Sequence, residues 1–244
     1  MIDVLPLWLR RESAAPAITI GERELPIVIR RLARSRRMTM RLAPDGSEVR
    51  ISMPTWGRTA DALAFAASRR DWLARQVAAI PGPVALGHGG TIAFRGAVLE
   101  IAHDPAARRR PAIEGPTLRI GGPEASLPSR LRRWMQDEAR ALLADDLAEY
   151  CVKAGRSAPK LALSNAQRRW GSCAPDGAIR INWRLIMAPD AVRRSVVAHE
   201  VAHLIHFDHS RAFHACLAGL FEGDIDHANA WLKRHGRSLY VPLG

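Results

Sequence analysis

The sequence predicts an α+β protein with two parts, an N-terminal β-rich unit with one helix and a C-terminal unit whose helices carry a cluster of histidines. Segments of alternating apolar and polar residues flank two Pro-Asp-Gly turns, which is typical of β-hairpins. Elsewhere, apolar residues recur every three to four positions, as on the buried face of a helix. The chain has 244 residues, enough for two small domains. A Gly-Gly-Pro sequence at 121–123 is the expected linker, so the expected units are 1–122 and 123–244.

The N-terminal part contains a hairpin, a helix and further strands. Residues 38–42 and 49–53 alternate in polarity on either side of a turn at 44–46, so they are expected to pair. Apolar residues at helical spacing predict one helix over 61–80, which a Pro-Gly-Pro sequence would end. Three more short strands are expected, at 91–94, 98–102 and 117–120.

The C-terminal part is expected to be more helical. A long apolar stripe predicts a helix over about 128–154. Pro189 and Asp190 begin another helix, which runs into the histidine-rich segment. Three short strands are expected between these helices, and the second Pro-Asp-Gly turn joins the last two: 161–164, 169–172 and 178–185.

Arginine dominates the charged residues of the chain. Lys and Arg total 36 against 24 Asp and Glu, a formal net charge of +12, and 33 of the 36 basic residues are Arg. Arg pairs well with phosphates and carboxylates, so an anionic partner such as a nucleotide or a nucleic acid is one expectation. A biased amino-acid composition is the alternative explanation, because net charge affects association rather than fold.

The compartment is predicted from three features. The first ten residues lack the basic start of a secretory signal, and no apolar run approaches the roughly 20 residues of a membrane helix. The three cysteines, Cys151, Cys173 and Cys216, form no CxxC pair. We therefore expect a cytoplasmic protein with no structural disulfide and no membrane association.

The residues that point to chemistry begin at His199. His199-Glu-Val-Ala-His203 places two imidazoles four residues apart on one face of a helix, where both can bind one metal ion. Neutral imidazoles suit Zn²⁺. Glu200 directly follows the first histidine and is positioned to take a proton from water beside the metal. The pattern predicts a zinc hydrolase site with Glu200 as general base.

A catalytic zinc ion needs a third protein ligand, and two histidines compete for this role. His206 shares the helix face with His199, but on an unbroken helix it lies about 10.5 Å further along the axis. His209 reaches the metal only if the helix ends and the chain turns back, and Asp208 tolerates the left-handed conformation that such a turn is expected to need. His209 is therefore the preferred third ligand, and His206 is the alternative.

With its flanking residues, this motif resembles the YgjP-like family of zinc metallopeptidases, relatives of the SprT and WLM proteases in the zincin group. The resemblance covers roughly residues 25–236. Its most specific parts are Trp170-Gly-Ser-Cys173, Ile181-Asn-Trp-Arg-Leu185 and the pattern HExxHxxHxxHS. The resemblance implies a zincin-like C-terminal unit with one zinc ion.

The resemblance also implies a role for each residue of the motif. The implied metal ligands are His199, His203 and His209, and Glu200 is the implied catalytic base.

The same resemblance implies how substrate is held. Zincin-type enzymes bind extended peptides along an edge strand, a role that falls here to Trp170, Gly171 and Ser172. The chain departs from metzincins, which carry Gly where this sequence has His206. It also departs from SprT proteins, because three scattered cysteines cannot build their zinc ribbon.

The leading interpretation is a zinc-dependent metallopeptidase that uses activated water to hydrolyse amide bonds in a peptide or protein. A metal-dependent nucleotide pyrophosphohydrolase is one alternative, supported by the arginines but lacking a Gly-rich phosphate loop. A basic nucleic-acid-associated protein with a degenerate site is another. Tyr240, Arg180 and His206 are candidates for stabilising the oxyanion, and Cys173 is expected to be a buried apolar residue rather than a nucleophile.

Overall fold

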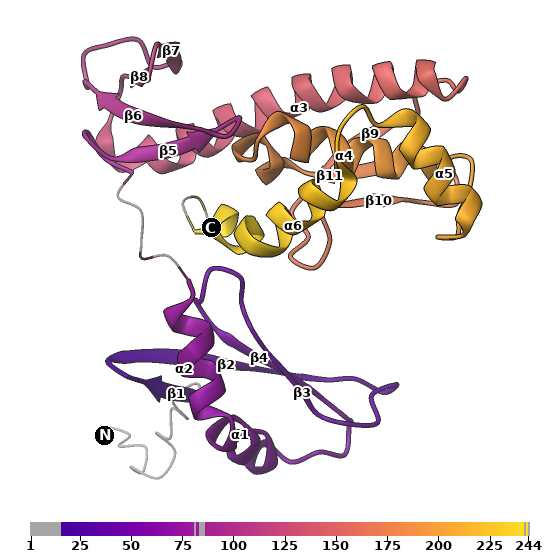
Figure 1. Cartoon of the computed structure of the whole chain (residues 1–244). Helices are drawn as coiled ribbons and strands as arrows, with labels where there is room; N and C mark the ends of the chain where they lie inside the picture. The colour runs from indigo at the N-terminus through magenta and orange to yellow at the C-terminus, as the bar shows by residue number, and fades with distance from the viewer. Residues whose placement is uncertain (1–15, 81, 83–85, 242, 244) are drawn as a thin grey trace, which may run out of the picture. The chain divides into compact units, whose positions relative to one another are not determined.

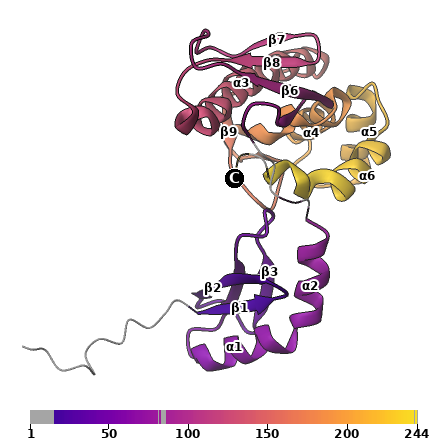
Figure 2. The same cartoon turned by 90° about the vertical axis from the view of Figure 1, so that its left-hand side faces the viewer.

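The computed structural model of this chain (Figure 1) describes residues 16–80, 82, 86–241 and 243. These residues form three small sheets and six α-helices, which confirms the expected α+β class. The chain divides into two units, Met1–Pro81 and Gly82–Gly244, of which the described part of the first has one sheet and that of the second has two (Figure 2). None of the helices in the described part of the chain combines the length and apolar character needed to cross a bilayer.

A four-stranded sheet forms the N-terminal unit, in the order β1-β2-β4-β3. The neighbours β2 and β4 are parallel, whereas the other two pairs are antiparallel. The expected hairpin is confirmed as β3 and β4, which are joined by a turn in which Gly46 has φ +73°. The elements of this unit are β1 (Ala17–Ile20), β2 (Arg23–Arg31), β3 (Thr39–Leu42), β4 (Val49–Met53), α1 (Thr59–Ser68) and α2 (Arg70–Ala78).

Two helices, α1 and α2, replace the single helix expected over 61–80. The break lies at Arg69, whose φ of −109° and ψ of 18° leave the helical region. No Gly or Pro lies near this position, so the local sequence carries no signal for the break. Each helix buries its own apolar residues, for example Ala66 in α1 and Leu73 in α2.

The boundary between the units lies well before the expected division into 1–122 and 123–244, so that prediction differs from the structure. Strands between residues 91 and 120 share one core with the long helix that follows them. Phe94 stacks on Trp134 of that helix with 5.0 Å between ring centroids. The apolar contacts therefore continue across the expected linker instead of stopping there.

The glycines of the expected linker have a different role in the structure. A Cβ on Gly121 would lie 1.9 Å from the carbonyl oxygen of Ala107, and Gly122 has φ +85°. Gly121 thus requires the absence of a side chain and Gly122 a left-handed backbone, and both N–H groups bond to the 105–108 segment within the C-terminal unit.

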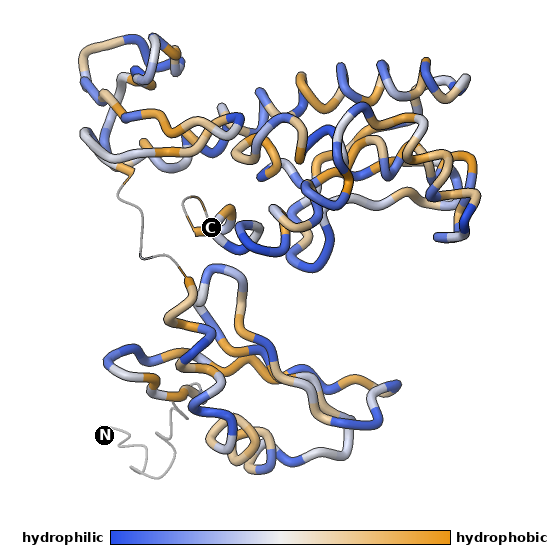
Figure 3. The backbone as a smooth tube through the Cα atoms, in the orientation of Figure 1, coloured by the Kyte–Doolittle hydropathy of each residue, from blue (hydrophilic) through white to orange (hydrophobic). Residues whose placement is uncertain are grey.

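The first sheet of the C-terminal unit has the order β5-β6-β8-β7 and packs on the long helix α3. The colours of Figure 3 show how hydrophobic and hydrophilic residues alternate along α3, and its buried face includes Leu131, Met135 and Leu143. Strand β7 was not expected, because all three of its residues are exposed and carry no alternation. These elements are β5 (Thr91–Phe94), β6 (Ala97–His103), β7 (Ala112–Glu114), β8 (Thr117–Ile120) and α3 (Leu127–Lys153).

The second sheet of this unit has the order β10-β11-β9, which leaves β10 at an edge. The strand expected over 178–185 ends earlier, because the Asn182 side chain accepts the Arg184 N–H and starts a 3-10 helix, Trp183–Met187. Three helices follow, and α4 lies against β10 and β11. These elements are β9 (Leu161–Ser164), β10 (Gly171–Cys173), β11 (Ile179–Asn182), α4 (Asp190–Ala202), α5 (Arg211–Leu220) and α6 (Ile225–His235).

A network of ion pairs holds α4 against α3. Arg193 Nε lies 2.7 Å from Asp146 Oδ2, and both side chains are buried. Arg194 Nη2 lies 2.8 Å from Glu149 Oε1, and its Nε lies 2.6 Å from Glu222 Oε1. Because buried charges need partners, this network sets the position of the helix that carries the histidines.

The stability contribution of Arg194 is expected to depend on pH. Hydrogen bonds from Arg194 and Lys153 lower the pKa of Glu149 from its usual 4.5 to about 2. The folded pKa lies below the unfolded one, so this stabilisation is complete above pH 4.5 and is lost as pH falls towards 2. Arg194→Met should lower the free energy of unfolding by about 1–3 kcal/mol at pH 7. Denaturant titrations at several pH values should show the difference from wild type shrinking between pH 4.5 and 2, whereas replacing the exposed Arg133 by Met should have little effect at any pH.

Candidate metal centre

Helix α4 and its last turn place two histidines side by side. His199 lies in the last turn of α4, and His203 is the residue that caps it. Their ring centroids are 4.9 Å apart. The spacing of four residues therefore has the consequence that the sequence predicts, since both rings project from one face.

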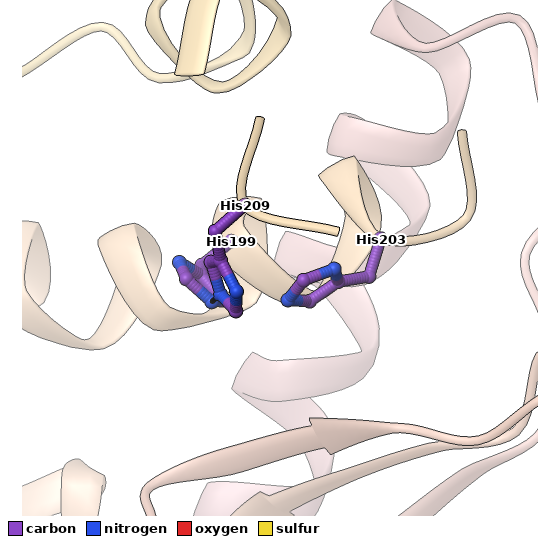
Figure 4. Close-up of side chains that lie close together, drawn as sticks. All are labelled: His199, His203 and His209. Atoms are coloured by element: carbon purple, nitrogen blue, oxygen red, sulfur yellow. Dashed lines mark hydrogen bonds between the residues drawn. The ribbon is translucent and has the colours of Figure 1, made fainter. Parts of the chain in front are cut away.

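The chain turns back after α4 and brings in a third histidine. The N–H groups of Ile205 and His206 bond to the carbonyl of Ala202, which closes the helix end. Ser210 then caps α5 by accepting the Phe213 N–H. His209, in the connecting turn, meets the other two rings in Figure 4, and all three donor atoms lie within 4.8 Å of one another.

The expected conformation of this turn is wrong in one respect. Among the residues that the structure describes, Arg95 is the only non-glycine residue with positive φ, so Asp208 is not left-handed. Instead, the Asp208 side chain accepts the Ser210 N–H at 3.3 Å. The turn is closed by side-chain hydrogen bonding rather than by an unusual backbone conformation.

The other candidate for the third position, His206, contributes its backbone. His206 O lies 3.0 Å from His203 Nδ1, so this ring nitrogen donates to the carbonyl and leaves Nε2 free. The His206 ring is outside the histidine group. Of the two alternatives, the structure brings His209 to the site.

The donor set fits a zinc ion. Zn–N bonds of about 2.0–2.1 Å in a tetrahedron put neighbouring nitrogens about 3.3–3.4 Å apart. His199 Nε2 and His209 Nε2 are 3.3 Å apart. Burial, followed by the neighbouring rings of His203 and His209, lowers the pKa of His199 to about 4. Its imidazole is therefore neutral at pH 7, the form that binds metals.

Phe213 lies under the three rings, a role that the sequence analysis did not identify. Its side chain is 0 % exposed, and its ring centroid lies 5.0, 4.6 and 4.9 Å from those of His199, His203 and His209. The apolar stripe of α5, which also includes Leu217, predicts that Phe213 is buried. It does not reveal what Phe213 contacts, because that depends on how α5 returns across α4.

Glu200 is buried beside the edge strand β10. Its residue is only 5 % exposed, and burial raises the pKa of the carboxyl to about 7, although Arg169 and a hydrogen bond from the Cys173 N–H oppose this shift. A Cβ on Gly171 would lie 2.3 Å from Glu200 Oε1. The glycine of the Trp-Gly-Ser-Cys motif therefore leaves the space that the carboxyl occupies.

Strand β10 presents backbone groups at a free edge of its sheet. Trp170 O accepts the Asn182 N–H, and the Ala174 N–H bonds to Ala178 O. Hydrogen-bonded pairs alternate in an antiparallel ladder, so Gly171 and Cys173 direct their N–H and C=O groups away from β11. The Cys173 N–H meets Glu200, which leaves the Gly171 backbone and the Cys173 carbonyl available at the edge.

The predicted substrate-binding residues divide between two faces of the sheet. Gly171 lies on the face towards α4, and Trp170 lies next to it in the pocket that Glu200 also lines. Ser172 pairs with Arg180 on the opposite face. The structure thus brings Trp170 and Gly171 to the histidine site but turns Ser172 and Arg180 away from it.

Tyr240 and Cys173, which the sequence also singled out, make contacts within the fold. The Tyr240 hydroxyl donates to Ala166 O at 2.8 Å and accepts from Asn182 Nδ2 at 3.0 Å, and its ring packs against that of Trp170, so its hydrogen bonds are made within the fold. Cys173 is partly buried, and burial, followed by Glu200 and Asp176, raises its pKa. The side chain is less buried than expected, while a thiol with a raised pKa is a poor nucleophile at neutral pH.

The sequence of this chain matches one known protein family. The sequence model of the YgjP-like metallopeptidase domain matches residues 36–235, which cover most of both units. No curated protein and no solved structure gave a match. On the extent of this match, the chain belongs to the YgjP-like metallopeptidase domain family.

Proposed function

We propose that this protein is a zinc-dependent metallopeptidase that hydrolyses peptide bonds. One observation supports the proposal: the buried Glu200 carboxyl lies against the edge strand β10 and lines the same pocket as His199, one of three histidines whose donor atoms converge. A hydrolase of extended peptides needs a metal, a base and a strand-like docking edge next to each other. The family to which the chain belongs supports the same activity.

His199, His203 and His209 would hold the zinc ion through one ring nitrogen each. When bound, zinc supplies Lewis acidity, which makes water easier to deprotonate and a carbonyl group more electrophilic. Two contacts orient these rings. The His206 carbonyl accepts a hydrogen bond from His203 Nδ1 and so fixes the tautomer of His203. The Phe213 ring packs against all three imidazoles.

Glu200 would act as the proton carrier of the reaction. A carboxylate oxygen takes a proton from the attacking water, and the same group then gives it to the nitrogen of the departing amine. Burial raises the pKa of this carboxyl, so it takes up a proton more readily than an exposed Glu would. The hydrogen bond from the Cys173 N–H holds the carboxyl in position.

The edge strand would bind the substrate backbone. An extended peptide can pair with the outward N–H and C=O groups of Gly171 and with the Cys173 carbonyl. The closeness of Gly171 to Glu200 brings a paired backbone directly to the proton carrier. Backbone recognition of this kind places few demands on substrate sequence at this strand.

The proposed role of Gly171 predicts a loss of activity without loss of the fold. In Gly171→Ala, the added Cβ would meet the Oε1, Cδ and Cγ atoms of Glu200, so the carboxyl must move. We expect kcat/KM for a peptide to fall by about 100-fold, as misplacement by about 1 Å can cause. The matched control is Gly219→Ala, where a Cβ would have open space, and this variant should retain full activity. Equal activity of Gly171→Ala and wild type, with both correctly folded by circular dichroism, would contradict the role.

The activity itself is tested with purified full-length protein against a mixed peptide library. We expect cleavage of peptides, loss of cleavage on treatment with a chelator, and recovery when zinc is added back. Nucleoside triphosphates form the second arm of the test. Chelator-sensitive release of pyrophosphate without peptide cleavage would replace the proposal with a nucleotide pyrophosphohydrolase.

A further inference from the structure

A pocket of about 230 Å³ opens beside the histidine site and is not used by any step described so far. Its walls come from β10, α4, α5 and α6. Glu200, His199 and Gly171 form part of its lining. The pocket is therefore continuous with the groups that we propose to bind and cleave the peptide.

The size of the pocket suits part of a substrate. Sites that enclose whole small molecules usually measure roughly 300–1,000 Å³. This pocket is smaller, yet it is several times larger than the about 30 Å³ that one water molecule occupies in the liquid. One amino-acid side chain of a bound peptide fits this range.

The interior of the pocket is apolar. Away from Glu200, which is also buried in the lining, the walls are mostly apolar: Val196 and Leu217 are 8 % and 4 % exposed, and Ile225 and Leu232 of α6 add partly buried apolar surface. Ser195 also lines it, but its hydroxyl donates to the Val192 carbonyl at 2.8 Å. The interior therefore favours an aliphatic or aromatic group over a polar one.

The exposed residues of the lining are polar. Arg169, on the segment that leads into β10, and Asn229 on α6 are both exposed and lie on the lining. Arg169 would repel a substrate Lys or Arg at this position. A substrate Asp or Glu would approach Arg169 but would have to leave it to enter the interior, which it would share with the buried Glu200 carboxyl.

We propose that this pocket binds one large apolar side chain of the substrate, of the size of Leu, Met or Phe, next to the bond that is cleaved. The inference rests on the proposed peptidase function, which it extends by naming the class of residue selected. Backbone pairing at β10 is tolerant of sequence, so the pocket supplies most of the selectivity near the cleaved bond. Val196, Leu217, Ile225 and Leu232 determine that selectivity.

The first experiment compares peptides that differ at a single position next to the cleaved bond, which carries Leu, Ala, Gly, Lys or Asp. We expect kcat/KM for Leu to exceed that for Ala by at least about tenfold, as hydrophobic pockets achieve. Lys and Asp peptides should be poorer still. Cleavage of all five at similar rates would overturn the pocket inference while leaving the peptidase proposal intact.

The second experiment blocks the pocket from α6. Asn229→Trp places a large ring at an exposed position of the lining, so it should bring the Leu-to-Ala ratio close to one without unfolding the protein. Ala230→Trp is the matched control, since Ala230 is exposed on the same helix but does not line the pocket. Asn229→Ala should keep the wild-type ratio. An unchanged ratio in Asn229→Trp would overturn the assignment of this pocket.

Binding measurements separate the two proposals. Calorimetric titration of the Glu200→Gln protein with the same peptides should show tighter binding of the Leu peptide than of the Gly peptide, and Asn229→Trp should abolish this difference. If no peptide is cleaved by the wild-type protein but the binding preference persists, the peptidase proposal fails and the pocket assignment stands. If cleavage occurs but neither assay shows a preference, only the pocket assignment fails.

Discussion

Replacing His209 by Ala is expected to remove nearly all of the zinc from the purified protein. The wild-type chain should carry about one equivalent, because three imidazoles converge with donor atoms within 4.8 Å of one another. Changes to residues that merely support a ligand typically weaken metal binding by 10- to 100-fold, so loss of a ligand should exceed about 100-fold. Metal content by mass spectrometry and competition with a zinc chelator give the two measurements.

His206→Ala is the matched control for this experiment. The histidines at 206 and 209 lie in the same turn, but residue 206 contributes only its carbonyl to His203, and alanine keeps that carbonyl. We expect His206→Ala to retain close to one equivalent of zinc. If His206→Ala lost the metal while His209→Ala kept it, the assignment of the third ligand would be reversed.

Replacing Glu200 by Gln should abolish hydrolysis while leaving the metal in place. Glutamine has nearly the same shape and can still accept the Cys173 N–H, but it cannot carry a proton. General acid–base catalysis typically contributes about 100- to 10,000-fold, so kcat should fall within or beyond that range. The thermal midpoint should not fall, because a buried carboxyl is replaced by a neutral amide.

The Glu200→Gln result is informative only together with metal analysis and a control. Glu124→Gln changes an exposed carboxylate and should leave activity, zinc content and stability as in wild type. A Glu200→Gln protein with full zinc content and wild-type peptide cleavage would eliminate Glu200 as the proton carrier. Loss of zinc in this variant would instead show that the residue supports the metal site.

Local sequence patterns predicted the parts of the site that lie within one element. The four-residue spacing of His199 and His203 gives a shared helix face wherever the helix lies, and it places Glu200 next to the first ring. The Pro-Asp-Gly turns likewise gave both hairpins, because such a turn and its alternating flanks are short-range features. Phe213 was not among these predictions, although the apolar stripe of α5 is a short-range feature that indicates its burial in the same way.

Contacts between distant elements were beyond these patterns. The division of the chain depends on the packing of β5, β6 and β8 against α3, which no short segment encodes. The Gly-Gly-Pro sequence resembles a linker in composition, but this packing places it inside one unit. The break between α1 and α2 at Arg69 is not marked by a Gly or Pro in the local sequence. In each case the local preference is weak, and the apolar surface buried by packing decides the outcome.

By itself, the sequence determined an α+β chain with two imidazoles and a carboxylate on one helical turn, since spacing along a helix needs no knowledge of the rest of the fold. The tertiary structure decided which histidine completes the group, what supports it and what faces the carboxylate. His209 arrives because hydrogen bonds close the turn after α4, Phe213 because α5 packs back across that helix, and Gly171 because β10 lies at the edge of its sheet. These relations join residues through packing and backbone hydrogen bonds, which depend on the whole unit and not on any short stretch of it.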